Sequence, residues 1–274
     1  MFSKPATSEL TSRLEEALRR GELVAQATLL TGPGRPGAKL LIFPDSTLVG
    51  SLGLDELDQR VRDDAVELML DGQGKKTAAT FEYEVSPAAG EAPATARVFL
   101  EAFPPPPHLV IFGGVHIAIP LTTFAKTLGF RVTVADPRTK FANPQRFPHA
   151  DAIIPEWPQK AVEQLDIGPS TYCVILTHDP KIDEPALKAV LGRNASYVGA
   201  IGSRKTHAER FERMARHGVS AEALSEVYAP IGLDLNGETP EEIALAIMAE
   251  IVAVRRGGSA GFMKAKRPET TQRE

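Results

Sequence analysis

The sequence predicts an α/β protein with two domains: a smaller α+β domain, followed by a parallel sheet with helices on both faces. Three observations favour this fold class. Apolar strand-like runs alternate with helical patterns throughout the second half, which is typical of a parallel sheet with crossover helices. In the first half, strand-like runs follow one another more directly, and a run of four prolines separates the two halves.

The proline run occupies residues 104–107. Proline lacks a backbone N–H and favours extended geometry, so four in succession form a stiff spacer. We therefore place the domains at residues 1–103 and 104–257. Residues 258–274 are rich in glycine and then basic and polar, and we expect this tail to be disordered.

Composition excludes several classes of protein. The chain has 274 residues and a formal net charge of −4, so neither nucleic acid nor an anionic membrane is an expected partner. The single cysteine, Cys173, excludes an internal disulfide and a multi-cysteine metal site. No apolar run is long enough to span a membrane, and no signal peptide precedes the first helix, so we expect a cytoplasmic protein.

The first domain is expected to contain helices and strands in mixed order. An apolar stripe of Leu57, Val61, Ala65 and Leu68 predicts a helix over residues 55–70. Another helix is expected at residues 8–20. Strands are expected at residues 23–30, 39–43, 76–85 and 96–102.

The second domain alternates strands and helices. Strands are expected at residues 109–112, 131–135, 152–155, 172–177 and 197–201, with helices at 117–128, 184–191 and 203–217. A capping box with proline at the first helical position starts the last helix at Thr239. Its continuation, residues 243–254, is apolar on nearly every face, and we therefore expect a homodimer that buries part of this helix.

A glycine turn follows the first strand of this domain. Gly113, Gly114, Val115 and His116 lead into a helix containing Ala118, and Asp136 ends the next strand. This pattern is typical of a Rossmann-like domain, in which glycines approach a pyrophosphate and an acidic residue accepts from ribose hydroxyls. Val115 departs from it, because a β-branched side chain stands where a phosphate should approach. The alternative is a βαβ unit that binds no dinucleotide.

A second candidate site is Gly202, Ser203, Arg204 and Lys205, where a strand leads into a helix. Cations in the first turn of a helix oppose its dipole, and an anion bound at the same helix end would offset this cost. The alternative is a simple serine N-cap followed by solvated basic residues. His207 is expected to be exposed or to assist the cap.

Two further segments follow strands or precede helices. Thr177, His178 and Asp179 end a strand and could supply acid–base or ligand groups, or could simply form a turn. Asp234 lies in a glycine-containing loop that leads to the last helix, and this loop either lines the pocket or only connects elements. The pattern predicts no metal site and no catalytic residue, since one histidine and one aspartate are too few for a metal.

The first domain contains two glycine-rich segments, residues 34–39 and 49–56. The first carries Arg35 and Lys39, so backbone amides and positive charge could hold an anionic ligand there. A β-turn with solvated charges explains the first segment almost as well, and Asp55 in the second is explained by helix capping.

Taken together, these motifs resemble the XdhC/CoxI family of molybdenum hydroxylase maturation factors, the xanthine dehydrogenase accessory proteins. The resemblance covers almost the whole chain. The matching segments in the second domain are residues 112–113, 129–138, 146–148, 177–179, 199–204, 230–234 and 239–242. The second of them ends at Arg138. Each segment alone is weak, but their order and spacing are specific.

The resemblance implies a non-catalytic chaperone for the molybdenum cofactor, either molybdopterin or its dinucleotide form. Such a protein protects the cofactor during sulfuration and delivers it to an enzyme such as xanthine dehydrogenase or carbon monoxide dehydrogenase. The implied partners are that hydroxylase and a cysteine desulfurase. The alternatives are an NAD(P)-dependent oxidoreductase, for which no Ser-Tyr-Lys set can be assembled, and a regulatory nucleotide-binding protein.

Two departures from the family pattern stand out. Relatives have Gly-Ala-Gly-His at the turn, where this chain has Gly113, Gly114, Val115 and His116. Many relatives also carry a Gly-Gly-Cys-x-Glu element in the first domain, but residues 50–56 here contain no cysteine. Cys173 is a poor substitute, because it lies within an expected buried strand.

Overall fold

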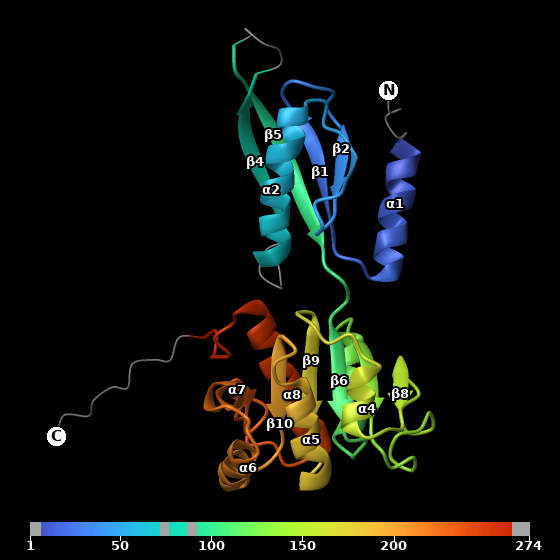
Figure 1. The fold of residues 1–274 in the computed structure, drawn as a ribbon, viewed down its shortest axis with the longest axis vertical. Coiled ribbons are helices and arrows are strands. Elements are labelled where there is room, and N and C mark those ends of the chain that lie inside the picture. The colour runs from blue at the N-terminus through green and yellow to red at the C-terminus, as the bar shows by residue number, and fades with distance from the viewer. Residues whose placement is uncertain (1–6, 72–76, 87–91, 265–274) are drawn as a thin grey trace, which may run out of the picture.

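The computed structural model describes residues 7–71, 77–86 and 92–264, and these residues form two sheets connected through prolines 104–107 (Figure 1). Residues 258–264 contain neither helix nor strand. The expectation of disorder for the rest of the tail falls on residues outside the described ranges.

The N-terminal sheet is antiparallel and has five strands in the order β3-β2-β1-β5-β4. The strands are β1 (Val24–Thr31), β2 (Lys39–Ile42), β3 (Leu48–Gly50), β4 (Ala78–Val85) and β5 (Ala94–Phe103). Two helices, α1 (Thr7–Arg20) and α2 (Asp55–Asp71), complete this part of the chain. The sequence did not predict β3, whose three residues are too few for a periodic pattern.

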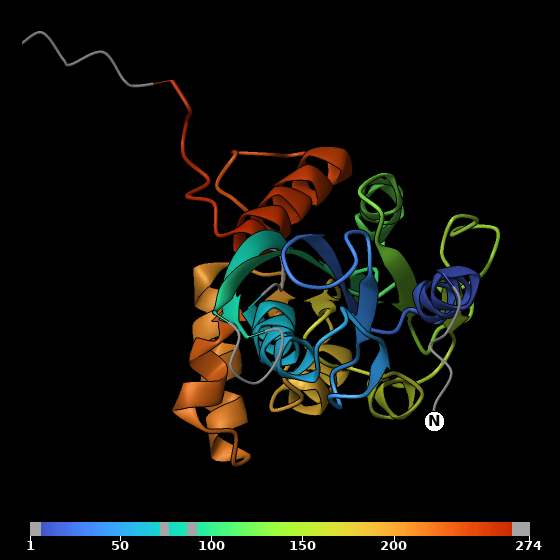
Figure 2. The same ribbon diagram turned by 90° about the horizontal axis from the view of Figure 1, so that it is seen from above.

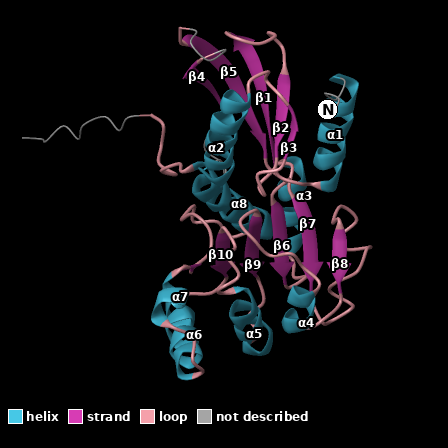
Figure 3. Cartoon of the chain, turned by 45° about the horizontal axis from the view of Figure 1, so that its top comes forward, coloured by secondary structure: helices cyan, strands magenta, loops and turns pink. Residues whose placement is uncertain are grey.

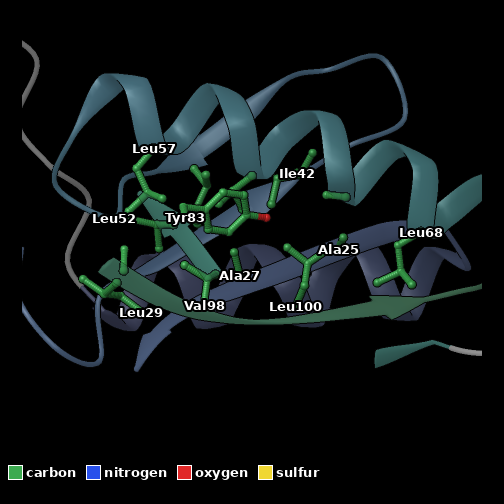
Figure 4. Packing of buried hydrophobic residues seen from close by; sticks show 14 of the residues in the cluster. Ala25, Ala27, Leu29, Ile42, Leu52, Leu57, Leu68, Tyr83, Val98 and Leu100 are labelled. Carbon is green, nitrogen blue, oxygen red and sulfur yellow. The ribbon is translucent and has the colours of Figure 1, made fainter. Parts of the chain in front are cut away.

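Helix α2 packs its apolar stripe against this sheet (Figure 4). Leu57, Val61 and Ala65 are fully buried, and Leu68 is nearly so, in one cluster with side chains of the strands. The predicted stripe is therefore confirmed. A separate cluster joins α1 to the sheet through residues that include Leu10, Ala17 and Leu41.

The C-terminal sheet has six strands, and every neighbouring pair is parallel. The strands are β6 (His108–Phe112), β7 (Arg131–Ala135), β8 (Ala152–Ile154), β9 (Thr171–Ile175), β10 (Tyr197–Ala200) and β11 (Val227–Tyr228). Their order is β11-β10-β9-β6-β7-β8. Numbered from β6, this is the 3-2-1-4-5-6 order of the Rossmann fold, so the predicted fold class is confirmed.

Helices cover both faces of this sheet (Figure 3). On one face, α3 (Ala118–Thr127) and α8 (Pro240–Arg256) pack together, and Figure 2 shows them side by side. On the other lie α4 (Pro158–Glu163), α5 (Pro180–Val190), α6 (Arg204–Arg216) and α7 (Ala221–Ser225). Helices α4 and α7 and strand β11 were not predicted, since each is shorter than two helical turns or a typical strand.

Two helix starts show how local chemistry sets the boundaries. Helix α5 begins at Pro180 rather than at residue 184, because Asp179 accepts a hydrogen bond from Lys181 N at 2.9 Å and proline occupies the first helical position. At α8, the predicted capping box is present between Thr239 and Glu242.

The apolar character of α8 is mostly explained by packing within the chain. Ala244, Ile247, Met248 and Ile251 are buried against α3 and the sheet, whereas Leu245 is 52% exposed. A homodimer through this helix remains a prediction. Within the described residues, no helix combines the length and the apolar character needed to cross a membrane.

Candidate functional site

The predicted ligand segments lie along one edge of the C-terminal sheet. Because the strands are parallel and Phe112, Ile175 and Ala200 are in register, the residues that follow them emerge at the same edge. This places Gly113, His178 and Ser203 along the carboxyl end of β6, β9 and β10. The strand order reverses direction between β6 and β9, which is where open α/β sheets leave a crevice for ligands.

At Gly113, the turn depends on the absence of a side chain. Its φ is +110°, and a Cβ at this position would lie 2.5 Å from Thr177 Cγ2. Its amide donates to the Ala135 carbonyl at 2.8 Å. The turn after β6 is therefore packed directly against the end of β9, across the point where the strand order reverses.

Asp136 reinforces this turn from the end of β7. Its carboxylate is fully buried and accepts hydrogen bonds from Gly114 N at 3.0 Å and from Arg138 N, Nε and Nη2 at 2.8–2.9 Å. Burial raises the pKa of Asp136, but the hydrogen bonds from Arg138 and Gly114 outweigh it and leave the pKa below its usual value. We expected this carboxylate to accept from ribose hydroxyls, but each of its oxygens already accepts two protein hydrogen bonds.

The remaining residues of the turn differ in exposure. His116 is exposed, whereas Val115 is half-buried and packs against the apolar cluster beneath α3. Arg146 donates to the Gly114 carbonyl at 3.0 Å from a separate segment, and its Nε is buried without a hydrogen-bond partner among the described residues. Arg146 belongs to a motif noted in the sequence, but its link to the turn was not predicted.

A buried network lies behind the end of β9. Thr177 donates a short hydrogen bond to Asp183 of α5, and Asp179 N donates to Thr177 Oγ1 at 3.2 Å. On its other side, Asp183 forms an ion pair of 2.8 Å with Arg210 of α6, and both side chains are almost completely buried. Arg210 also donates to the carbonyl of Ile201 at 3.3 Å, so the network ties the end of β9 to the end of β10.

Burial dominates the electrostatics of this ion pair. Burial raises the pKa of Asp183 to about 7, although the hydrogen bond from Thr177 and the charge of Arg210 lower it. His178, by contrast, is exposed and lies outside the network.

The first turn of α6 carries the predicted cations. Ser203 caps the helix, accepting from Thr206 N at 3.2 Å. Arg204 and Lys205 are exposed, and neither forms an ion pair within the part of the chain that the structure describes. Both charges are therefore available to a ligand at this helix end.

His207, expected to be exposed or to assist the cap, is only 3% exposed, because it packs between Arg210 and the end of β10. Arg210 Nη1 lies 3.2 Å from its Nδ1, and a guanidinium can only donate. Burial and the charge of Arg210 lower the pKa of His207, so the ring is neutral near pH 7 and the Nε2 atom carries its proton. The Ala200 and Gly202 carbonyls favour protonation of the ring, yet no described group makes a hydrogen bond to Nε2.

This geometry fits an oxyanion at the start of α6. A Cβ on Gly202 would lie 3.1 Å from His207 Nε2 and 3.3 Å from Thr206 Cγ2, so the glycine allows the turn after β10 to pack closely over the buried ring. An anionic oxygen at this helix end could accept from the free amides of the first turn, while Arg204 and Lys205 contribute positive charge. The exposed cations and the free amides thus both favour a negative ligand here.

Asp234 contributes to a neighbouring hollow rather than to the turn. A cavity of about 370 Å³ lies between the start of α6, residues 230–237 and the start of α8, and both Arg204 and Asp234 line it. The loop therefore borders the proposed anion site. Glycine residues 113 and 114 do not line this cavity.

The described residues contain neither a cluster of metal ligands nor an accessible thiol. Among the described residues, no group of three or more His, Cys, Asp or Glu side chains could hold a metal ion. Cys173 is fully buried in β9, as predicted, and burial raises the pKa of its thiol to about 12. A thiol of this kind is unreactive near neutral pH.

Two family models match the chain. Residues 109–251 match the XdhC Rossmann domain, and residues 17–84 match the XdhC and CoxI family. Among curated proteins, the chain is 31% identical over 162 residues to a probable xanthine dehydrogenase subunit of Bacillus subtilis (strain 168), covering 59% of this chain and 47% of the relative. It is also 31% identical over 99 residues to the molybdenum cofactor insertion chaperone PaoD of Escherichia coli (strain K12), covering 36% of this chain and 30% of that protein.

The chain spans less than half the length of the curated relatives it matches. A solved structure, described as a xanthine dehydrogenase from Bacillus halodurans, aligns with 93% of this chain and 97% of its own, at 22% sequence identity and a TM-score of 0.50. At this identity the likeness supports the fold alone.

Proposed function

Because the chain belongs to the XdhC and CoxI family, we propose that it is a chaperone that binds the molybdenum cofactor and assists its insertion into a molybdenum hydroxylase. The similarity to PaoD, named as an insertion chaperone, supports this role. The cofactor supplies redox chemistry to its client enzyme once inserted. The residues of this chain would only hold and shield it.

The observation that carries the proposal is the anion site at the start of α6. Molybdopterin carries a phosphate, and its dinucleotide form carries a pyrophosphate. Gly202, Ser203, Arg204 and Lys205 provide matching backbone amides and positive charge. We propose that this helix end holds the phosphate group.

The rest of the cofactor would lie along the sheet edge toward the switch point. The residues proposed to border it are Gly113, Gly114, Val115, His116, Thr177, His178 and Asp179, with Asp234 at the opposite end. Asp136 and Arg138 would act indirectly, since their side chains pair with each other and hold the Gly114 amide. They are positioning residues in this proposal.

The sulfur donor is proposed to lie outside this chain. Cys173 is the single cysteine of the sequence and is fully buried. Sulfuration would therefore need a partner such as a cysteine desulfurase acting on cofactor held at the sheet edge. A hydroxylase client, a cytoplasmic location and a homodimer belong to the same proposal.

The test is the double substitution Arg204→Ala with Lys205→Ala. We expect at least tenfold weaker binding of molybdopterin or its dinucleotide form by calorimetry, about 1.4 kcal/mol. The unliganded protein should keep or slightly gain thermal stability, because each cation opposes the helix dipole by roughly 0.3–1 kcal/mol.

A matched control removes two cations from helix ends remote from the site. Lys188→Ala with Arg216→Ala, in the last turns of α5 and α6, causes the same change in net charge. Its affinity for the cofactor should stay within about twofold of the wild type. Equal affinities for the two double variants would refute the anion site.

The strand order also favours an NAD(P) dinucleotide as an alternative ligand. Against it stands Asp136, whose carboxylate is already saturated by protein donors. Titration with reduced nicotinamide dinucleotide beside molybdopterin separates the two. If the nicotinamide dinucleotide binds saturably and molybdopterin does not bind, the chaperone role is overturned in favour of an oxidoreductase or a regulatory protein.

A further inference from the structure

The two glycine-rich segments of the N-terminal domain surround one pocket. Residues 34–39, between β1 and β2, and residues 50–53, between β3 and α2, line a cavity of about 470 Å³ with Leu10 of α1. The antiparallel pairing of β2 with β3, which places Leu40 opposite Gly50, brings these segments together. The volume falls within the range of small-molecule sites.

The pocket is positively charged. Its lining includes Arg35 and Lys39 but no aspartate or glutamate. Arg35 is exposed, and the half-buried Lys39 donates to Thr28 Oγ1 at 3.2 Å. Within the described ranges, neither cation forms an ion pair with a carboxylate.

The walls of the pocket are formed largely by backbone. A Cβ on Gly34 would lie 2.7 Å from the Leu52 carbonyl oxygen, so the two segments are in direct backbone contact there. Ser51 is half-buried in the lining, and its hydroxyl accepts from Gly53 N at 3.0 Å. A ligand in the pocket therefore meets polar backbone, one hydroxyl and two positive side chains.

The pocket lies at the far end of the domain from the linker. Val24, at the start of β1, pairs with Phe103, the last residue before the prolines, whereas the pocket lies beyond the opposite end of β1. In the C-terminal sheet, the chain enters at the start of β6, so the anion edge also faces away from the linker. Figure 1 shows these two ends of the molecule at opposite extremes of its long axis.

We propose that this pocket is a second binding site, for a small phosphorylated molecule, that acts independently of the edge of the C-terminal sheet. Arg35 and Lys39, which form no ion pair within the described ranges, favour a phosphate group, and the buried Asp58 carboxylate is already engaged by the Leu52 amide at 2.8 Å. The distance between the two ends prevents one small ligand from contacting both sites within a chain. The two sites should therefore bind separately.

The experiment measures inorganic pyrophosphate binding to the full chain by calorimetry, in the Arg204→Ala, Lys205→Ala background. Ser51→Asp adds a negative charge to the pocket, and Ser51→Asn is its neutral match. Either side chain can accept the Gly53 amide hydrogen bond that Ser51 now accepts. We expect Ser51→Asp to weaken pyrophosphate binding at least tenfold and Ser51→Asn to stay within about twofold of its parent.

A second variant removes the cations instead. Arg35→Gln with Lys39→Gln should produce a similar loss, while Arg97→Gln, which removes an exposed cation paired with Glu82 in the same sheet, should leave binding unchanged. Equal pyrophosphate affinity in Ser51→Asp and Ser51→Asn would overturn the proposal, as would the absence of any binding in the parent background. If only the proposed anion site at the start of α6 is wrong, the outcome differs. The Arg204→Ala, Lys205→Ala parent should then bind pyrophosphate as tightly as the wild type, and Ser51→Asp should still weaken that binding.

Discussion

Replacing Gly113 by alanine would test the packing of the glycine turn against β9. The new methyl group would lie 2.5 Å from Thr177 Cγ2, about 1 Å closer than carbon atoms normally approach. Overpacking of this kind costs about 1–3 kcal/mol. A side chain at a φ of +110° adds roughly 1–2 kcal/mol. We expect a loss of about 2–5 kcal/mol in the free energy of unfolding.

Thr177→Ser removes the clashing methyl group and keeps the hydroxyl that bonds Asp183 and the Asp179 amide. Alone it should cost about 1 kcal/mol, for one buried methyl group. In the double variant the methyl contact disappears, and only the tighter-than-usual 3.1 Å approach of the new Cβ to Thr177 N remains. The double variant should therefore be about 1–2 kcal/mol more stable than the sum of the single effects predicts.

Urea unfolding followed by fluorescence measures these values, since Trp157 is the only tryptophan and lies in the C-terminal half of the chain. Gly192→Ala is the control: Gly192 has a φ of +81° and no atom within 4 Å of an added Cβ, so only the backbone cost of about 1–2 kcal/mol remains. Additive effects of Gly113→Ala and Thr177→Ser, within about 0.5 kcal/mol, would refute the proposed contact.

Two other substitutions probe the same edge. Arg210→Met leaves Asp183 buried without its partner and should cost about 3–5 kcal/mol, whereas the double change with Asp183→Asn should cost clearly less. Because the pKa of Asp183 is already raised to about 7 and rises further without Arg210, the folded state holds a proton that the unfolded state releases. The stability of the Arg210→Met variant should therefore fall as pH rises from about 4, the ordinary carboxyl pKa, to above 7, and a flat profile by thermal unfolding would contradict this. Val115→Gly should strengthen binding of the dinucleotide form of the cofactor in calorimetry, and an unchanged affinity would mean that Val115 does not obstruct the phosphates.

The order of motifs along the chain was sufficient to predict the position of the sheet edge. Gly113, His178 and Ser203 each follow a strand, and in a parallel sheet all such residues emerge on one side. The capping roles of Ser203 and Thr239 were also accessible, because helix starts depend on local sequence. These features depend on neighbours in the sequence or on one topological rule.

The buried network was not predictable in the same way. Asp183, His207 and Arg210 are polar residues on helices, where exposure is the usual expectation. They become buried because α5 and α6 converge on the ends of β9 and β10, which no local pattern indicates. Similarly, the saturation of Asp136 depends on where Arg138 and the Gly114 amide lie in space.

These buried pairs explain how an edge containing several carboxylates can attract an anion. Asp136 is neutralised by Arg138, and Asp183 by Arg210, so each buried negative charge is balanced within the protein. Asp179 is engaged in capping α5. The charges left at the start of α6 are then the two cations Arg204 and Lys205, against the single carboxylate of Asp234 across the neighbouring cavity. Losing the half-buried Arg138 or the buried Arg210 should therefore weaken anion binding without removing any atom that touches the ligand.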